Sequence, residues 1–270
     1  MGSQEINFYM LNKTLYKIDI LVVILQPLLA TILTIVFQLN LMSSIILYFG
    51  VPGLYLSFRR PSLVKKAVIF AFVFALPMAF LIEFFAELDV SWFFPTTIFP
   101  WKLFGFVILE GIIWGLFWSF YAVMFYEYFF DTPRERGVMS PHIKYLVIGF
   151  ILALIIFFSI MTIRYDFLYV DYFYFKLGII VAVVPLVTVL SIFPRLWKKF
   201  VKVSVYFFGL SIMHELSALS VHQWEYPGKN FIGWVELFGA RFPFEEFFFW
   251  IIIGVAALLS WYEFFVDDQR

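Results

Sequence analysis

The stretch "RFPFEEFFFWIIIG", residues 241–254, places two adjacent glutamates, Glu245 and Glu246, at the start of an apolar run. A helix needs about 20 mainly apolar residues to cross the hydrocarbon core of a bilayer, and this run continues to residue 266. Charged side chains are costly at membrane depth, and where they occur they usually serve a function. The stretch therefore predicts a membrane span with a functional site near its start.

The composition of the whole chain agrees with a membrane protein. The 270 residues are 63% hydrophobic and 14% charged, whereas soluble domains hold about 25% charged residues. The mean hydropathy is +0.93. The net charge is zero, which gives no reason to expect a nucleic-acid partner, and the absence of cysteine excludes disulfides and thiolate chemistry.

Apolar stretches long enough to span a membrane recur along the chain. The eight stretches lie at 18–38, 40–58, 63–87, 104–130, 143–163, 172–193, 198–220 and 242–266. The loops between them are short, and no separate soluble domain is evident. We therefore expect an all-α, polytopic membrane protein with about eight transmembrane helices.

The positive charges predict an orientation for these helices. With eight spans, 14 of the 19 lysines and arginines fall on one side of the membrane and five on the other. The five are Lys102, Arg164, Lys176, Lys229 and Arg241. Since positive residues collect on the cytoplasmic side, we expect both termini to be cytoplasmic.

Landmarks of the first half of the chain recur in the second half at nearly constant spacing. Pro52, Pro61 and Lys66 recur as Pro185, Pro194 and Lys199 (offset 133); Glu83, Trp92 and Pro95 as Glu215, Trp224 and Pro227 (offset 132); Glu110 and Tyr126 as Glu246 and Tyr262 (offset 136). Chance gives one or two such matches, but not all of them in order. We interpret the pattern as two parallel tandem repeats of four helices, at 1–137 and 138–270.

Several glutamates fall inside the predicted spans, near the ends that face away from the cytoplasm: Glu83, Glu110, Glu215, Glu245 and Glu246. Because the connecting loops are short, we expect neighbouring helices to bring these carboxyl groups together. Carboxyl groups that lie close together in apolar surroundings tend to keep a proton between them. A protonated carboxyl group is a proton donor, which suits acid catalysis.

Other polar residues have simpler structural interpretations. We expect Glu127 and Glu263, at the cytoplasmic helix ends, to lie among lipid headgroups. The loops "WFFP" (92–95) and "WEYP" (224–227) fit an interfacial aromatic belt, although their repetition favours a role at the mouth of a pocket. For His214, a hydrogen bond to a neighbour is favoured over metal ligation.

The segment 214–265 resembles the membrane-integral lycopene cyclase family. The family pattern has an acidic residue late in one helix, then a W-x-x-P-like loop, a glycine, and P-x-E-E followed by phenylalanine. Here these positions are Glu215, Trp224 and Pro227, Gly239, and Pro243 through Glu246 followed by Phe247. The first half is similar more weakly, through Glu83, Trp92, Pro95, Gly105 and Glu110, and its P-x-E-E motif is degenerate. The resemblance covers about residues 40 to 265.

This resemblance implies ring closure at the end of an acyclic carotenoid such as lycopene, without redox change. We expect Glu245 and Glu246 to carry the proton chemistry, with Glu215, Glu110 and Glu83 as further catalytic residues. The residues expected to bind the lipid-soluble polyene are Trp224, Pro227, Pro243, Phe247, Trp250 and Trp92. Since the chain has no G-x-G-x-x-G fingerprint and only three histidines, we expect no flavin, nicotinamide or metal cofactor.

The main alternative is a non-catalytic isoprenoid binder or a proton-coupled carrier on the same duplicated bundle. A carrier would use the acidic residues of both repeats equally, whereas a cyclase would depend on the P-x-E-E copy. A di-iron hydroxylase would need many histidines, a prenyltransferase would need paired aspartate-rich loops, and a retinal photoreceptor would need a lysine in the last span. The sequence offers none of these features.

Overall fold

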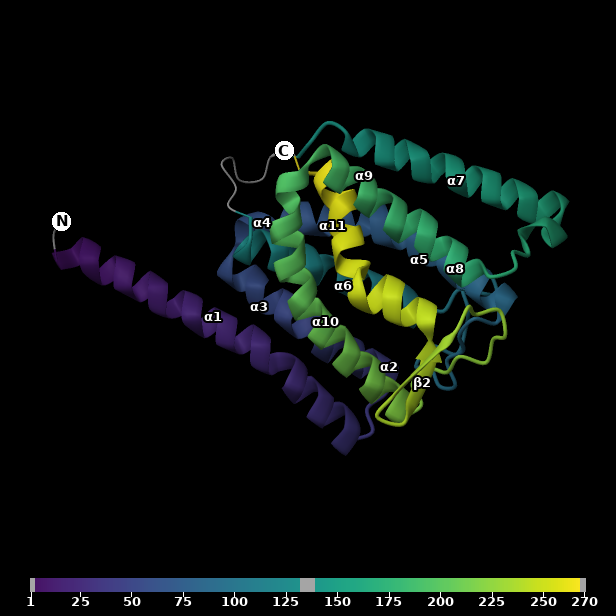
Figure 1. Ribbon diagram of the computed structural model, residues 1–270, viewed down its shortest axis with the longest axis horizontal. Coiled ribbons are helices and arrows are strands. Elements are labelled where there is room, and N and C mark those ends of the chain that lie inside the picture. Colours follow the sequence, from purple (N-terminus) through teal and green to yellow (C-terminus); the bar gives the residue numbers. More distant parts are fainter. Residues whose placement is uncertain (1–2, 132–138, 268–270) are drawn as a thin grey trace.

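The computed structural model describes residues 3–131 and 139–267. Within them, seven helical segments are long and apolar enough to cross a membrane, and a bent pair of helices forms an eighth candidate (Figure 1). The seven are Thr14–Val36 of α1 (Ser3–Val36), Leu41–Arg59, Pro61–Asp89, α6 (Leu109–Phe129), α7 (Ile143–Ile163), Phe173–Ile192 and Pro194–Ser220. The bent pair is η6 (Glu246–Ile252) with α11 (Gly254–Phe265), which meet at 52°. The expected all-α, multi-pass architecture with about eight spans is confirmed at this level.

Three of the spans consist of two α-helices joined by a wider π-helix. They are α2 (Leu41–Ile45), η1 (Ile46–Gly50) and α3 (Val51–Arg59); α4 (Pro61–Phe70), η2 (Ala71–Ala75) and α5 (Leu76–Asp89); and α8 (Phe173–Leu177), η4 (Gly178–Val183) and α9 (Val184–Ile192). In each case proline is the second residue after the π-helix: Pro52, Pro77 or Pro185. Proline lacks an N–H group, and its ring collides with the carbonyl four residues earlier. A wider turn at this place relieves the collision without ending the span.

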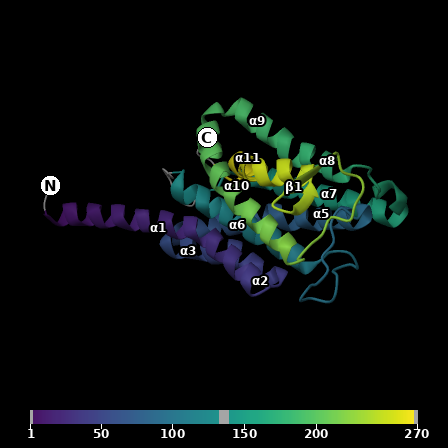
Figure 2. The same ribbon diagram turned by 60° about the horizontal axis from the view of Figure 1, so that its bottom comes forward.

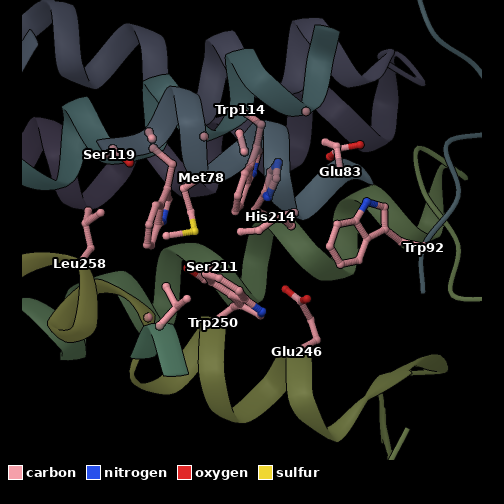
Figure 3. A pocket seen from close by; sticks show the side chains of 18 of the residues that line it. Met78, Glu83, Trp92, Trp114, Ser119, Ser211, His214, Glu246, Trp250 and Leu258 are labelled. Atoms are coloured by element: carbon pink, nitrogen blue, oxygen red, sulfur yellow. The ribbon is translucent and has the colours of Figure 1, made fainter. Parts of the chain in front are cut away.

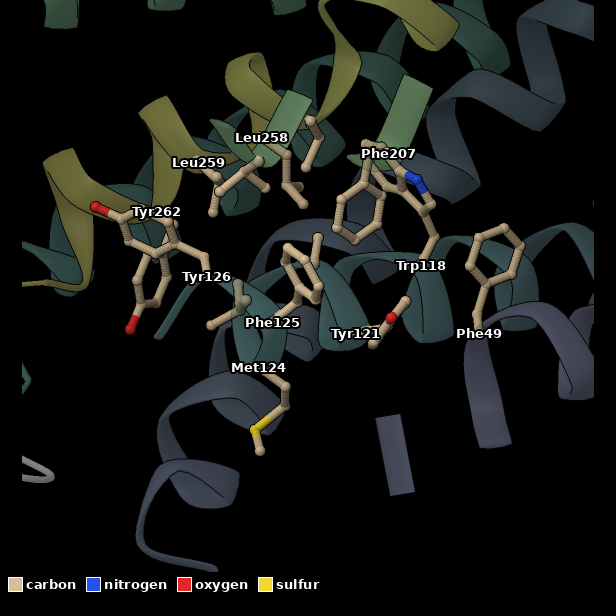
Figure 4. Close-up of a cluster of buried hydrophobic side chains, with 14 of the residues drawn as sticks. Phe49, Trp118, Tyr121, Met124, Phe125, Tyr126, Phe207, Leu258, Leu259 and Tyr262 are labelled. Carbon is tan, nitrogen blue, oxygen red and sulfur yellow. The ribbon is translucent and has the colours of Figure 1, made fainter. Parts of the chain in front are cut away.

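Helix α6 lies at the centre of the bundle, against α3, α4, α5 and α11. Its side chains enter a cluster of buried aromatic and aliphatic residues that includes Trp118, Tyr121 and Phe125 (Figure 4). The hydroxyl groups of Tyr121 and Tyr206 are hydrogen-bonded at 2.6 Å. Lipid tails are as apolar as these side chains, so close packing and such polar contacts stabilise the bundle more than hydrophobic burial does.

Helix α7 lies along one edge of the bundle (Figure 1). It leaves an apolar surface uncovered. Ile151, Leu152, Ile155 and Ile156 are each more than half exposed. Contiguous apolar surface of this kind is rare on soluble monomers. It fits a helix that faces lipid.

Helix α1 lies along another edge of the bundle (Figure 2). Its Asp19 joins it to the bundle. The Asp19 carboxylate is buried and pairs with both Nε and Nη2 of Arg59, at 2.8 and 3.0 Å. It also accepts hydrogen bonds from Tyr55, at 2.5 Å, and from Tyr128. Because these donors come from α3 and α6, the single carboxylate links α1 to two helices.

The remaining elements are η3 (Tyr165–Leu168), η5 (Pro194–Leu196), α10 (Trp197–Ser220), and a hairpin of β1 (Trp234–Leu237) and β2 (Ala240–Pro243). The hairpin corrects the expectation that the last span starts at residue 242, because this residue lies in β2. Its two turn residues, Phe238 and Gly239, both have positive φ, as a tight two-residue hairpin requires. Phe104 and Gly105 repeat this conformation beside a bridge between Leu103 and Val107.

Reciprocal contacts connect the two halves of the chain at both ends of the bundle. At one end, Phe93 and Glu225 form an antiparallel backbone bridge, with N···O distances of 2.8 and 2.9 Å. At the other end, Tyr126 donates a hydrogen bond to Glu263, and Tyr262 donates one to Glu127.

Two lysines complete this second group, which we call the end cluster. Lys66 Nζ lies 2.9 Å from Asp267 and 3.3 Å from Glu127, and Lys199 Nζ lies 2.5 Å from Asp131. The end cluster thus comprises Lys66, Tyr126, Glu127, Asp131, Lys199, Tyr262, Glu263 and Asp267. Glu127 and Glu263 are 3% and 1% exposed, so the prediction that they lie among headgroups is wrong. Sequence position alone did not reveal that each has a tyrosine donor on the opposite half of the chain.

Candidate active site

A cavity lies between helices α5 and α6 of the first half and segments α10 and η6 of the second half. Its volume is about 160 Å³, roughly ten times the space that one water molecule needs. Six of the nine tryptophans and four glutamates line it: Trp92, Trp114, Trp118, Trp224, Trp250, Trp261, Glu83, Glu110, Glu215 and Glu246. An aromatic wall with a few polar groups is the usual character of a small-molecule site.

Glu246 is the first residue of η6, and its carboxyl group reaches into the cavity from the side opposite Glu83 (Figure 3). The hydroxyl of Tyr174, in α8, donates a hydrogen bond to Oε2 of Glu246. Tyr174 is buried, and its ring stacks on Trp250 with 6.3 Å between the ring centroids. The neighbouring tyrosine therefore fixes one carboxyl oxygen while the side chain lines the cavity.

Glu215 lies in α10 and is almost completely buried. Its Oε1 accepts hydrogen bonds from Trp224 Nε1 at 3.2 Å and from the Tyr226 hydroxyl at 3.0 Å. Burial raises the pKa of the Tyr226 phenol well above its ordinary value, so this hydroxyl keeps its proton and remains a donor. In the first half, Trp92 is the corresponding neighbour of Glu83, and both line the cavity. Each of these glutamates thus lies beside the tryptophan nine residues further along the chain.

Glu110, which also lines the cavity, and Glu245 differ from the other three glutamates in accepting hydrogen bonds from the backbone. Oε1 of Glu110 accepts backbone hydrogen bonds from Ile98 at 2.6 Å and Phe99 at 3.1 Å. Oε1 of Glu245 accepts one from Ile232 at 2.7 Å, and Glu245 does not line the cavity. Both carboxyl groups therefore hold a preceding loop against the start of a helix. The structure thus separates Glu245 from Glu246, the two residues expected to carry the proton chemistry together, because only Glu246 lines the cavity.

The contacts align Glu110 with Glu245, whereas the sequence pattern aligns it with Glu246. Glu110 and Glu245 make the same kind of loop contact, 135 residues apart, and the reciprocal tyrosine–glutamate pairs relate Tyr126 to Tyr262, 136 residues apart. The interval from Glu245 to Tyr262 is therefore one residue longer than the interval from Glu110 to Tyr126. A π-helix accommodates an additional residue in its wider turn, and η6 lies within this interval.

Of the six residues expected to bind the substrate, three line the cavity and three do not. Trp92, Trp224 and Trp250 line the cavity. Pro227, Pro243 and Phe247 do not. Pro243 is the last residue of the hairpin, where it pairs with Trp234, and Phe247 packs against Phe208 and Phe242.

Two tryptophans of α6 were missed by the sequence analysis, although a signal was present. Trp114 and Trp118 stack with centroids 5.7 Å apart and ring planes 5° apart, and both line the cavity. With Glu110 they form a series at spacing four, which places them on one helix face. Tyr174 gave no comparable signal, because only tertiary packing brings it to Glu246.

His214 lies in the cavity wall, with its ring 4.8 Å from Tyr48, 5.0 Å from Phe49 and 5.0 Å from Trp224. Among the residues described, its Nε2 has no hydrogen-bond partner, so the expected hydrogen bond to a neighbour is not found at this nitrogen. The one group of three carboxylates close enough to share a cation, within the same residues, is Glu127, Asp131 and Asp267 of the end cluster. The ammonium groups of Lys66 and Lys199 already contact these carboxylates.

Comparison with known proteins does not assign this site to a family. No protein-family model, curated protein or solved structure matches the chain. The function must therefore be inferred from the cavity and from the side chains that line it.

Proposed function

We propose that this protein is a carotenoid cyclase, which closes the acyclic end groups of a lycopene-like polyene into rings. The observation that carries the proposal is the carboxyl group of Glu246 in a tryptophan-lined cavity inside a membrane bundle. A lipid-soluble polyene would have to enter this cavity from the bilayer. A carboxyl group in apolar surroundings is suited to hold a proton and to deliver it to a substrate.

In the proposed reaction Glu246 donates its proton to the terminal double bond of the polyene. The resulting carbocation is attacked by the next double bond, which forms the ring carbon–carbon bond and moves the positive charge into the ring. Loss of a proton to a base then leaves a new double bond. One proton is gained and one is lost, so the product is an isomer of the substrate and no electron carrier is needed.

The other cavity residues fit the stabilisation of the carbocation. The faces of aromatic rings attract cations, and tryptophan does so most strongly. Trp114, Trp118 and Trp250 supply such faces. Glu83 and Glu215 lie in the same wall. When ionised, they add negative charge that stabilises the carbocation. We assign them the role of receiving or sharing the proton.

We further propose that the chain consists of two parallel four-helix repeats, at 1–137 and 138–270, which build one shared site. The reciprocal pairs Tyr126–Glu263 and Tyr262–Glu127 support this duplication, as does the Phe93–Glu225 bridge. Contacts that are exchanged in this way are expected when two similar units face each other across an approximate twofold axis.

A proton-coupled carrier is the second candidate. The matching Glu83–Trp92 and Glu215–Trp224 pairs favour it, because a carrier would use equivalent acids of both repeats. Glu246 distinguishes the two proposals. When Glu110 is aligned with Glu245 by their loop contacts, the residue of the first half that matches Glu246 is Gly111, which has no carboxyl group. Equal loss of function on replacing Glu83 and Glu215, without ring formation by the wild type, would favour the carrier.

The distribution of positive charge leads to a prediction about topology. We expect both termini to lie on the cytoplasmic side, because 14 of the 19 lysines and arginines then fall there. Compartment-sensitive reporters fused to each end will measure this. A translocated carboxyl terminus would contradict the predicted orientation, and termini on opposite sides would rule out eight spans.

Expression in a bacterium that accumulates lycopene tests the proposed activity. We expect cyclic carotenoids to replace part of the lycopene, as separated by chromatography. Purified protein in liposomes with lycopene should form the same rings without added flavin, nicotinamide or metal. A strict requirement for one of these additions would contradict the proposed acid mechanism.

A further inference from the structure

The carboxyl group of Glu83 lies directly over Gly111, in the first turn of α6. A Cβ atom built on Gly111 would lie 2.3 Å from Oε1 and 2.7 Å from Cδ of Glu83, whereas ordinary van der Waals contact begins near 3.4 Å. The missing side chain of Gly111 is thus what leaves room for the Glu83 carboxyl group in the cavity wall. Both residues line the cavity.

The Glu83 carboxyl group lies between two features of the first half. On one side, its neighbour is Trp92. On the other side, α6 begins at Leu109, and the amide groups of a first helical turn have no carbonyl in a preceding turn to bind. The positive end of a helix stabilises a nearby negative charge.

The corresponding place in the second half is occupied differently. With Glu110 matched to Glu245 by their loop contacts, Gly111 matches Glu246. Where the second half presents a carboxyl group from the helix itself, the first half presents a glycine and fills the space with Glu83 from α5.

We propose that Gly111 is a positioning residue: its lack of a side chain sets the Glu83 carboxyl group against the first turn of α6, facing the cavity. This inference rests on the proposed cyclase function for its catalytic consequence, although the placement of Glu83 can be measured without activity. Alanine at position 111 forces the carboxyl group to move by about 1 Å before ordinary contact is reached. Since the end of a flexible side chain can move, the helix itself remains intact.

Gly111→Ala is expected to reduce ring formation by about 10- to 100-fold, because a misplacement of about 1 Å in a site can cost roughly 100-fold in rate. Glu83→Asp withdraws the carboxyl group by about one carbon–carbon bond, roughly 1.5 Å. Glu83→Asp combined with Gly111→Ala should therefore be more active than Gly111→Ala alone. The control is Gly209→Ala in α10, where an added Cβ meets no atom within 4 Å, and it should retain wild-type activity.

A second measurement separates this inference from the proposed function. The infrared band of the Glu83 carboxyl group is the one that disappears in Glu83→Gln, and it should shift in Gly111→Ala but not in Gly209→Ala. If the wild type forms no rings while this shift is observed, the cyclase proposal fails and the placement holds. The inference would be overturned if the band did not shift in Gly111→Ala. It would also be overturned if the wild type were active and the double variant were no more active than Gly111→Ala.

Discussion

Replacing Glu246 by glutamine is expected to lower the rate of ring formation by about 100- to 10,000-fold, the usual contribution of a general acid. Glutamine has nearly the same shape and still accepts the hydrogen bond from Tyr174, but it cannot deliver a proton. The bundle should therefore fold and insert as before. The measurement is the initial rate of cyclic carotenoid formation at equal protein content in membranes.

Glu245→Gln is the matched control for this prediction, since it makes the same chemical change one residue earlier. Glu245 is buried outside the cavity, and glutamine can still accept the hydrogen bond from the Ile232 amide. We expect this variant to keep most of the activity. The assignment of the proton donor would be wrong if Glu245→Gln were inactive while Glu246→Gln retained the wild-type rate.

The second large effect is expected in the end cluster, from Lys66→Met. Methionine is close in length to lysine but removes the cation that lies between Glu127 and Asp267. Both carboxylates are buried, and removing one partner of a buried ion pair costs about 3–5 kcal/mol. We expect this loss of unfolding free energy in thermal unfolding of the detergent-solubilised protein.

Lys102→Met provides the comparison for Lys66→Met. Lys102 pairs with Glu87 at 2.7 Å, but both side chains are about one-third exposed or more, and exposed pairs contribute about 0–1 kcal/mol. Its melting temperature should stay close to that of the wild type. Equal melting temperatures for the two variants would mean that the end cluster does not join the halves as proposed.

The spans could be predicted because a membrane imposes a length and an apolar character that are visible in one dimension. The stretch 143–163 was predicted to the residue, and 172–193 and 198–220 nearly so. The hairpin at 234–243 could not be predicted in this way. Its second strand continues directly into the apolar run, and the turn at Phe238 and Gly239 shows only in the backbone conformation.

The site was predicted in part for a related reason. The predicted glutamates could be found because a carboxyl group inside an apolar run is conspicuous, and the structure brings four of the five to one cavity: Glu83, Glu110, Glu215 and Glu246. The distinction between Glu245 and Glu246 could not be made, because it depends on which of two adjacent side chains a π-helix turns inward. The partners Tyr174 and Gly111 lie far from them in sequence, and only packing shows their relation.

Ring formation in heavy water tests the central claim most directly. Purified protein in liposomes is supplied with lycopene in D₂O, and the pigments are examined by chromatography and mass spectrometry. If a carboxyl group that exchanges with solvent starts the reaction by protonating the polyene, each ring closed should carry one deuterium. The same product formed in H₂O should have the mass of lycopene. If correctly folded wild-type protein returned only unchanged, acyclic lycopene, this result would contradict the account.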